Sequence, residues 1–159
     1  MEPQVYDPVV DALERAPSIV VPLVHEVPER DLKRRPQPGK WSAHEHACHL
    51  AAVQPMFFER LELLLGQDHP TIRPYLPESE HAEDALLAVD LDEAMARYQR
   101  ERVALVARLR NLRPVDWDRT AEHPEYRRYS LFILFRHAAM HDMLHAYRIE
   151  ECLLNGEWP

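Results

Sequence analysis

Histidines at regular spacing near the end of the chain are the residues best suited to chemistry. His137, His141 and His145 lie four residues apart in the segment 131–154, LFILFRHAAMHDMLHAYRIEECLL, which contains no Pro or Gly and is expected to form one helix. Residues four apart share one face of an α-helix, which has about 3.6 residues per turn. Because divalent ions such as zinc bind neutral imidazole, this spacing predicts part of a metal site.

A metal site on this helix needs a ligand from another part of the chain. In the upstream segment WSAHEHACHL, His49 shares a helical stripe with Val53 and Met56, so it is expected to face the core. Two helices packed side by side would bring His49 to the downstream pair. The predicted ligands of one divalent metal ion are therefore His49, His141 and His145.

Other histidines leave alternatives open. His46 could take the place of His49, and His137 could add a fourth ligand, whereas His44 lies off the stripe of His49. The chain has ten histidines, so accidental spacing on ordinary half-buried helix faces is a competing explanation. The HExxH motif of zinc proteases is absent, because His49 follows Glu45 at the wrong spacing, and this disfavours a protease mechanism.

Apolar residues recur at three- and four-residue spacing in the elements that must position these histidines, which predicts amphipathic helices. The segments are 8–27, 42–65, 90–112 and 131–154. Pro17 and Pro22 predict that the first helix is kinked or split, and Pro55 predicts a bend in the second. The Pro-rich stretch 66–89 is expected to be a long crossover with one short helical turn. The pattern favours one all-α domain over residues 1–159, a four-helix bundle with one long crossover.

Two local patterns mark helix starts, and one charged residue interrupts a helix. Ser42 with Glu45, and Asp90 with Glu93, have the spacing of a capping box. Glu45 could instead orient a ligand imidazole or move a proton, but the cap explains it completely and is preferred. Arg102 breaks the apolar stripe of the third helix, so its side chain either extends to the surface or is paired inside.

Composition excludes several classes of protein. The formal net charge is −8 and the 19 Lys and Arg are dispersed, which argues against nucleic-acid binding. Cys48 and Cys152 are too few and too far apart for a disulfide scaffold, and Cys152 is left off the ligand set as a small buried hydrophobe. No signal-peptide pattern and no long apolar run is present, so we expect a soluble, cytoplasmic protein that is not bound to a membrane.

Several blocks of the sequence resemble one family. Residues 40–50, KWSAHEHACHL, resemble the WSxxExxxHL signature of the DinB/YfiT-like superfamily, and residues 141–149, HDMLHAYRI, resemble its second block. The RxxLxxxLxxL-like run from Arg102 and the connection around Trp117 extend the likeness to nearly the whole chain. The resemblance implies a four-helix bundle, often a homodimer, that holds a divalent metal ion, zinc or nickel, with three histidines.

The same resemblance implies the ligand set and the activity. Carried over residue by residue, the ligands are His49, His141 and His145. Characterised relatives imply transfer or isomerisation chemistry on a small-molecule substrate with a low-molecular-weight thiol, and the concrete version is a bacillithiol- or mycothiol-type S-transferase. The alternatives are a metal-dependent hydrolase and a metal- or ligand-binding bundle without turnover, because a fold does not determine a function.

The chain departs from the family at one position near the proposed ligands. Family members often have Gln three residues after the last histidine, whereas this chain has Arg148. Arg148 shares a stripe with His141, so one hypothesis is that it binds an anionic group of the substrate. The preferred alternative is that it pairs with Glu45 or a backbone carbonyl.

Overall fold

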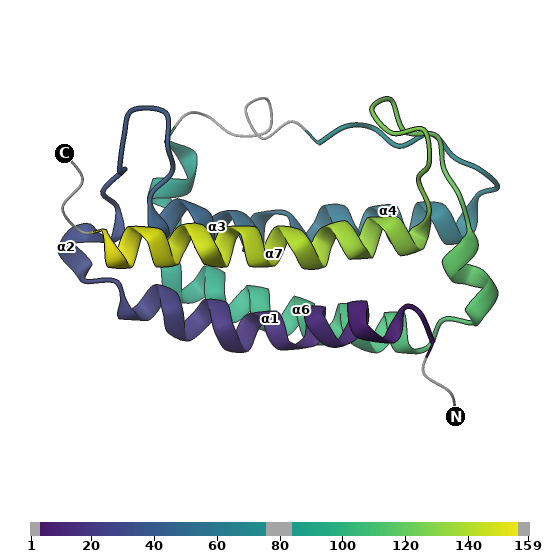
Figure 1. Ribbon diagram of the computed structural model, residues 1–159, viewed down its shortest axis with the longest axis horizontal. Coiled ribbons are helices and arrows are strands. Elements are labelled where there is room, and N and C mark those ends of the chain that lie inside the picture. Colours follow the sequence, from purple (N-terminus) through teal and green to yellow (C-terminus); the bar gives the residue numbers. More distant parts are fainter. Residues whose placement is uncertain (1–3, 76–83, 156–159) are drawn as a thin grey trace.

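Four long helical segments lie side by side in the part of the chain that the computed structural model describes, residues 4–75 and 84–155 (Figure 1). In chain order the helices are α1 Asp7–Glu26, α2 Glu29–Leu32, α3 Ala43–Ala52, α4 Gln54–Gly66, η1 Ala85–Ala88, α6 Leu91–Arg110, η2 Pro114–Asp118 and α7 Leu131–Leu154. Within these ranges the only β-type pairings are isolated bridges, Thr71 with Glu122 and Thr120 with Ser130. The predicted all-α four-helix bundle is confirmed.

Each long segment packs against two others around a shared core. α7 and α6 each lie against both α1 and α3, so the two helices that carry the candidate ligands, α3 and α7, are direct neighbours. Phe135 belongs to one half of the apolar core and Ile149 to the other. Cys48 and Cys152 are free thiols buried in the second half, as expected for small hydrophobic residues.

The first helix passes through its two prolines without interruption. α1 includes both Pro17 and Pro22, so of the two alternatives, a kink or a split, the split does not occur and the kink stays a prediction. Pro17 has no N–H to donate to the carbonyl oxygen of Leu13. Arg102 Nη1 of α6 donates to that oxygen at 3.1 Å instead. A side chain from a neighbouring helix therefore replaces the hydrogen bond that Pro17 removes from α1.

The second segment starts where the sequence indicates and is interrupted beside Pro55. Ser42 Oγ accepts from the N–H of Glu45 at 3.2 Å, and the Glu45 carboxylate accepts from the N–H of Ser42 at 2.9 Å, which completes the capping box. α3 ends at Ala52 and α4 begins at Gln54, with Pro55 in its first turn. The helix is thus interrupted at Val53, where Pro55 predicted a bend, and the bend itself stays a prediction.

A buried ion pair joins α6 to α7. Arg102 is 1% exposed and Asp142 is 0% exposed, and Arg102 Nη2 donates to Asp142 Oδ1 at 3.1 Å while Nη1 donates to Oδ2. Arg102 Nε also donates to Gln54 Oε1 at 3.4 Å, and the guanidinium carbon lies 4.9 Å from the centre of the Tyr98 ring. Of the two alternatives for Arg102, internal pairing is correct.

The crossover after α4 is anchored to the loop that precedes α7. The N–H of Ile72 donates to the carbonyl oxygen of Glu122 at 2.8 Å, and the N–H of Glu122 donates to that of Pro70 at 2.8 Å. The short helical turn expected in the crossover is η1. Residues 76–83 of the crossover lie outside the described part of the chain.

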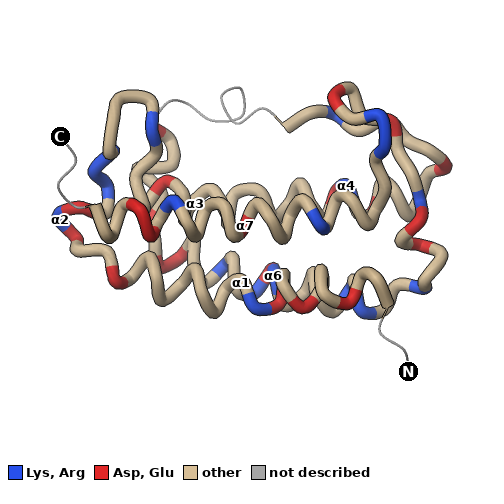
Figure 2. Tube along the Cα trace, viewed as in Figure 1, with Lys and Arg blue, Asp and Glu red and all other residues tan. Residues whose placement is uncertain are grey.

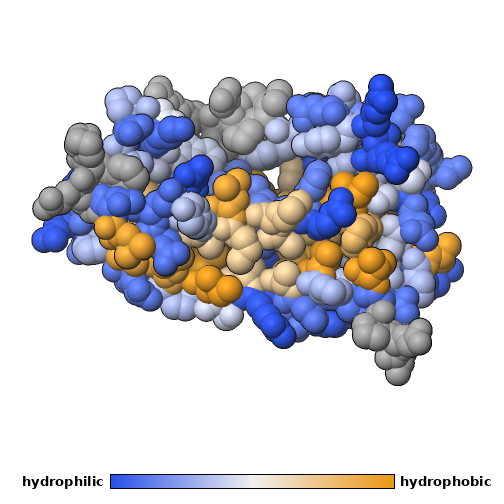
Figure 3. All heavy atoms as spheres, in the orientation of Figure 1, coloured by the Kyte–Doolittle hydropathy of each residue, from blue (hydrophilic) through white to orange (hydrophobic). Residues whose placement is uncertain are grey.

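Charges and apolar side chains are distributed differently over the surface. Lys and Arg positions are interspersed with Asp and Glu positions along the trace (Figure 2). Apolar side chains gather on the face that carries α7 (Figure 3), where Met140, Leu144 and Tyr147 are exposed. A homodimer interface would need an exposed apolar surface of this kind. The homodimer itself stays a prediction. No described helix has the length and apolar character needed to cross a membrane.

Candidate metal centre

The histidines selected from the sequence come together between two neighbouring helices. His49 lies in the last turn of α3, and His141 and His145 lie one turn apart on α7. His141 Nε2 is 3.1 Å from His49 Nε2 and 3.0 Å from His145 Nε2. One nitrogen from each ring lies within 4.8 Å of the other two. The structure therefore gathers the three candidate ligands at one point.

This convergence fits a divalent cation better than a set of hydrogen bonds. An imidazole nitrogen carries either a proton or a lone pair, so His141 Nε2 has at most one proton to share with both neighbours. A cation at the same point would accept all three lone pairs. Nitrogens bound to a tetrahedral zinc ion lie roughly 3.3 Å apart, close to the 3.0 and 3.1 Å seen here. The donor set fits zinc or a similar ion.

Aromatic rings lie around the cluster, and burial keeps the imidazoles of His141 and His145 neutral. The Trp41 ring centre lies 4.8 Å from that of His49 and 6.0 Å from that of His145, and Phe57 is 6.4 Å from His141. Burial lowers the pKa of His141, and burial together with the other imidazoles lowers that of His145 well below its usual value. At neutral pH these rings are therefore in the form that binds a metal ion.

His46 holds the ring of His145 from the other side. The Nδ1 atoms of the two rings are 2.8 Å apart. When His145 keeps its Nε2 lone pair for a metal ion, its Nδ1–H donates to His46 Nδ1. Burial lowers the pKa of His46 to about 4, so His46 remains neutral and able to accept. The sequence had offered His46 only as a substitute for His49, because its real partner lies 99 residues along the chain.

Comparison with known proteins places this bundle in a family. The family model described as the DinB superfamily matches residues 12–149. The chain belongs to the DinB superfamily. The resemblance read from the two histidine blocks is confirmed.

Two curated proteins and one solved structure are similar to this superfamily member. A protein of Oceanobacillus iheyensis, provisionally named a metal-dependent hydrolase, is 28% identical over 118 residues, 73% of this chain and 67% of that protein. A protein of Bacillus mycoides with the same provisional name is 26% identical over 124 residues, 77% of this chain and 70% of that protein. YfiT from Bacillus subtilis, described as a probable metal-dependent hydrolase with an unusual four-helix bundle topology, has a TM-score of 0.85 at 23% identity, over 100% of this chain and 95% of that one. The similarity to YfiT shows a shared fold.

The remaining histidines that the sequence offered lie outside the cluster of this DinB-superfamily chain. His44 is buried, and its Nε2 donates to the carbonyl oxygen of Leu86 at 3.1 Å. His137 lies edge-on to Tyr126 and Tyr129, with ring centres 5.4 and 6.4 Å away. His44 therefore anchors η1 to α3, and His137 belongs to a separate aromatic group.

Glu45 is held by its cap and by an ion pair that the sequence did not reveal. Arg35 Nε donates to Glu45 Oε2 at 3.0 Å, and Arg35 Nη2 donates to Oε1. Burial alone would raise the pKa of the Glu45 carboxyl, but hydrogen bonds from Arg35 and Ser42 bring it below its usual value. Both oxygens of Glu45 are thus occupied, which confirms the cap and leaves no oxygen to move protons at the cluster.

Glu45→Gln is expected to lower the free energy of unfolding at pH 7 by roughly 1.5–3 kcal/mol, because it removes a charged hydrogen-bonding partner of Arg35 and Ser42. The folded-state pKa of Glu45 is depressed, so its contribution is present above the unfolded value of 4.5 and is lost as pH falls through the folded value. Urea unfolding at pH 7 and below 4.5 should show the difference narrowing. The exposed Glu59→Gln is the control, and an equal loss there would contradict the assignment.

Arg148 has a different partner from the one expected. Its Nη1 donates to Glu151 Oε2 at 2.6 Å, and its side chain is 50% exposed. Glu45 is bound by Arg35, so the expected pair between Arg148 and Glu45 is wrong.

A pocket of about 190 Å³ opens beside the cluster, with His141 in its wall. Its lining comes mainly from α4, the crossover after α4, the segment before α7 and α7 itself, and includes Phe57, Arg60, Tyr129 and His137. The sequence did not single out Arg60 or Tyr129. The only local signal was the density of His, Tyr and Arg in the stretch 123–129, HPEYRRY.

Proposed function

We propose that the protein is a divalent-metal-dependent enzyme in which His49, His141 and His145 hold the ion. The observation that carries this proposal is the position of His141, which belongs to the cluster and also lines the pocket. An ion held by three neutral imidazoles keeps a position for an outside ligand and lowers the pKa of a thiol or water that binds there. A small organic substrate in the pocket would reach the metal-bound thiol or water beside His141.

Within this class, we propose transfer from a low-molecular-weight thiol of the bacillithiol or mycothiol type, with zinc or nickel as the ion. A metal-bound thiol loses its proton outright, whereas attack by water gains from a positioned general base. Glu45 has both oxygens occupied, and Asp142 is bound by Arg102 in the core. Neither of these two carboxylates is therefore available as a base, which favours thiol chemistry and leaves Glu125, in the wall of the pocket, as the carboxylate that hydrolysis would need.

Hydrolysis is the second candidate. Two curated relatives, 28% and 26% identical, carry the provisional name of metal-dependent hydrolases. The same three imidazoles and the same pocket would serve a hydrolase. A bundle that binds metal without turnover is the remaining alternative.

The first test is metal content by mass spectrometry on untagged protein purified without chelator, beside His145→Ala. We expect near-stoichiometric metal in the parent and its loss in the variant. Zinc- and nickel-loaded protein is then given a chloronitrobenzene electrophile with bacillithiol or mycothiol, and separately a nitrophenyl ester without thiol. Conjugation that needs both the thiol and the metal is the expected result.

The other outcomes separate the candidates. Ester cleavage that needs metal but no thiol would replace the transferase with a hydrolase. Metal binding with no turnover in either assay would leave a non-catalytic bundle. Absence of metal in both proteins, even after incubation with zinc, nickel and manganese, would remove the enzymatic proposal and make the histidines structural.

A further inference from the structure

Arg60 places a cation in the wall of the pocket beside His141. Its Nη1 donates to Tyr129 Oη at 3.3 Å, and its Nη2 donates to the carbonyl oxygen of Arg73 at 2.8 Å. Among residues 4–75 and 84–155, no carboxylate lies within ion-pairing distance of Arg60, although Glu125 lines the same pocket. The charge of this half-buried guanidinium is therefore available to an anion that enters the pocket.

Flat rings form the wall around this cation. His123 has its ring centre 4.6 Å from those of both Tyr126 and Tyr129, and the two tyrosine rings are nearly parallel at 6.2 Å. His137 of α7 stands edge-on to both tyrosines. Burial lowers the pKa of His123 and His137, so both are neutral at pH 7. They add planar surface to the pocket without adding a second charge.

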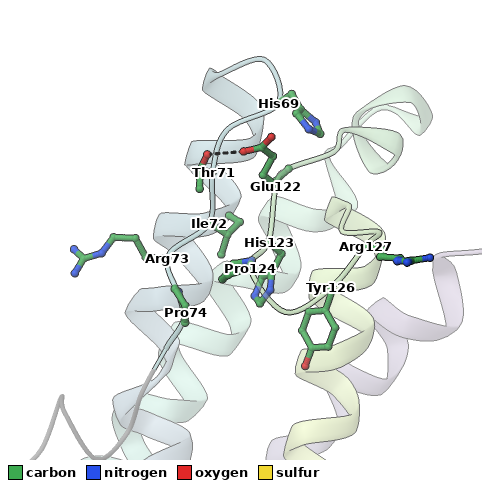
Figure 4. A pocket seen from close by; sticks show the side chains of 11 residues that line it. His69, Thr71, Ile72, Arg73, Pro74, Glu122, His123, Pro124, Tyr126 and Arg127 are labelled. Carbon is green, nitrogen blue, oxygen red and sulfur yellow. Dashed lines mark hydrogen bonds between the residues drawn. The ribbon is translucent and has the colours of Figure 1, made fainter.

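A larger outer hollow of about 690 Å³ adjoins this pocket and shares Pro74, His123 and Tyr126 with it. Figure 4 shows Tyr126 directed toward α7, whereas Arg73 and Arg127 extend outward on opposite sides of the hollow. The cations of the outer hollow thus point away from its centre. Arg60, which lines only the inner pocket, is the cation placed to bind a group beside His141.

The donors around Arg60 match one kind of anion. A guanidinium fork binds a planar carboxylate well. Burial raises the pKa of the Tyr129 phenol, which keeps its proton and can donate it because its oxygen accepts from Arg60. A single guanidinium balances one negative charge, and the exposed Glu125 on the same wall disfavours a phosphate dianion. The volume of about 190 Å³ exceeds the roughly 150 Å³ of a cavity that holds benzene, so one ring or a short acyl chain fits.

We propose that this pocket binds a small organic carboxylate, with the carboxylate on Arg60 and Tyr129 and the rest of the molecule against the aromatic wall, directed toward His141. The proposal deepens the proposed function, on which it rests, because it names the substrate as a carboxylate-bearing small molecule. It also moves the anion site from Arg148, which pairs with Glu151, to Arg60.

Calorimetric titration with benzoate, and with uncharged benzamide of the same shape, tests the proposal on zinc-loaded and zinc-free protein. Arg60→Met is expected to weaken benzoate binding roughly 10- to 100-fold and to leave benzamide unaffected. Tyr129→Phe keeps the ring and is expected to weaken benzoate binding about three- to tenfold. Arg108→Met, which removes a surface guanidinium paired with Glu62, and Arg148→Gln are the matched controls and should bind benzoate like the parent.

Several results would overturn the carboxylate site. These are equal affinity for benzoate and benzamide, unchanged benzoate affinity in both Arg60→Met and Tyr129→Phe, and loss of benzoate binding in Arg148→Gln instead. Benzoate binding that disappears without zinc and ignores Arg60 would mean a carboxylate on the ion, which also refutes the proposal. Arg60-dependent binding by a protein that never takes up metal would uphold the carboxylate site while the proposed enzyme fails.

Discussion

Asp142→Ala is expected to lower the free energy of unfolding by about 3–5 kcal/mol and the melting temperature by roughly 6–20 °C. The change leaves the Arg102 cation in a core where it is 1% exposed and where its remaining hydrogen-bond partners, the Gln54 amide and the Leu13 carbonyl, are neutral. The desolvation cost of that charge is then uncompensated. Urea unfolding monitored by circular dichroism, with thermal melts beside it, measures the effect.

The double variant Arg102→Met with Asp142→Leu is the matched control. It removes both charges and fills the space with apolar side chains, so it should recover most of the lost stability. The free energy of unfolding should stay about 1–3 kcal/mol below that of the parent, because the carbonyl oxygen of Leu13, which Pro17 cannot serve, loses Arg102 as its donor. If Asp142→Ala lowers the free energy of unfolding by less than about 1 kcal/mol, the ion pair is not shielded from water, and water reaches Arg102.

The helices were predictable because their determinants are local. The cap of Ser42 and Glu45 and the helix interruption beside Pro55 depend on residues within one turn of each other, and each lies where the sequence indicated. Of the kink or split expected at Pro17 and Pro22, the split does not occur, and the reason at Pro17 is non-local. Pro17 leaves the carbonyl oxygen of Leu13 without its donor in the helix, and Arg102 of α6 donates to that oxygen instead. No spacing within α1 reveals this donor.

In the candidate site, too, the local features could be predicted from the sequence and the non-local contacts could not. The four-residue interval between His141 and His145 is a property of one helix, and His49 needed only the expectation that two helices pack side by side. The contacts of His46 with His145 and of Arg60 with Tyr129 join residues 99 and 69 positions apart. Pairings of that kind depend on the rotation of each helix about its axis, which the apolar pattern fixes only coarsely.

Zinc is expected to raise the melting temperature of the parent protein, and His141→Ala is expected to abolish the rise. At a free zinc concentration about 1,000 times the dissociation constant, binding to the folded state adds about 4 kcal/mol, or roughly 8–16 °C. His141 matters most because its Nε2 lies within 3.1 Å of both other rings. Without it, His49 and His145 remain as two nitrogens on different helices, and two imidazoles hold zinc weakly. Thermal melts with zinc and with chelator measure the shift.

His137→Ala is the control that removes one histidine without touching the cluster. His137 lies on the same helix as His141 but outside the cluster, so this variant should keep the full zinc-dependent shift in melting temperature. His46→Ala should give a smaller shift, with zinc affinity reduced roughly 10- to 100-fold, because the Nδ1–H of His145 loses its acceptor. A parent shift that survives in His141→Ala would place the ion elsewhere. An equal loss in His137→Ala would mean that zinc binds to histidines in general, and not to the three that converge between α3 and α7.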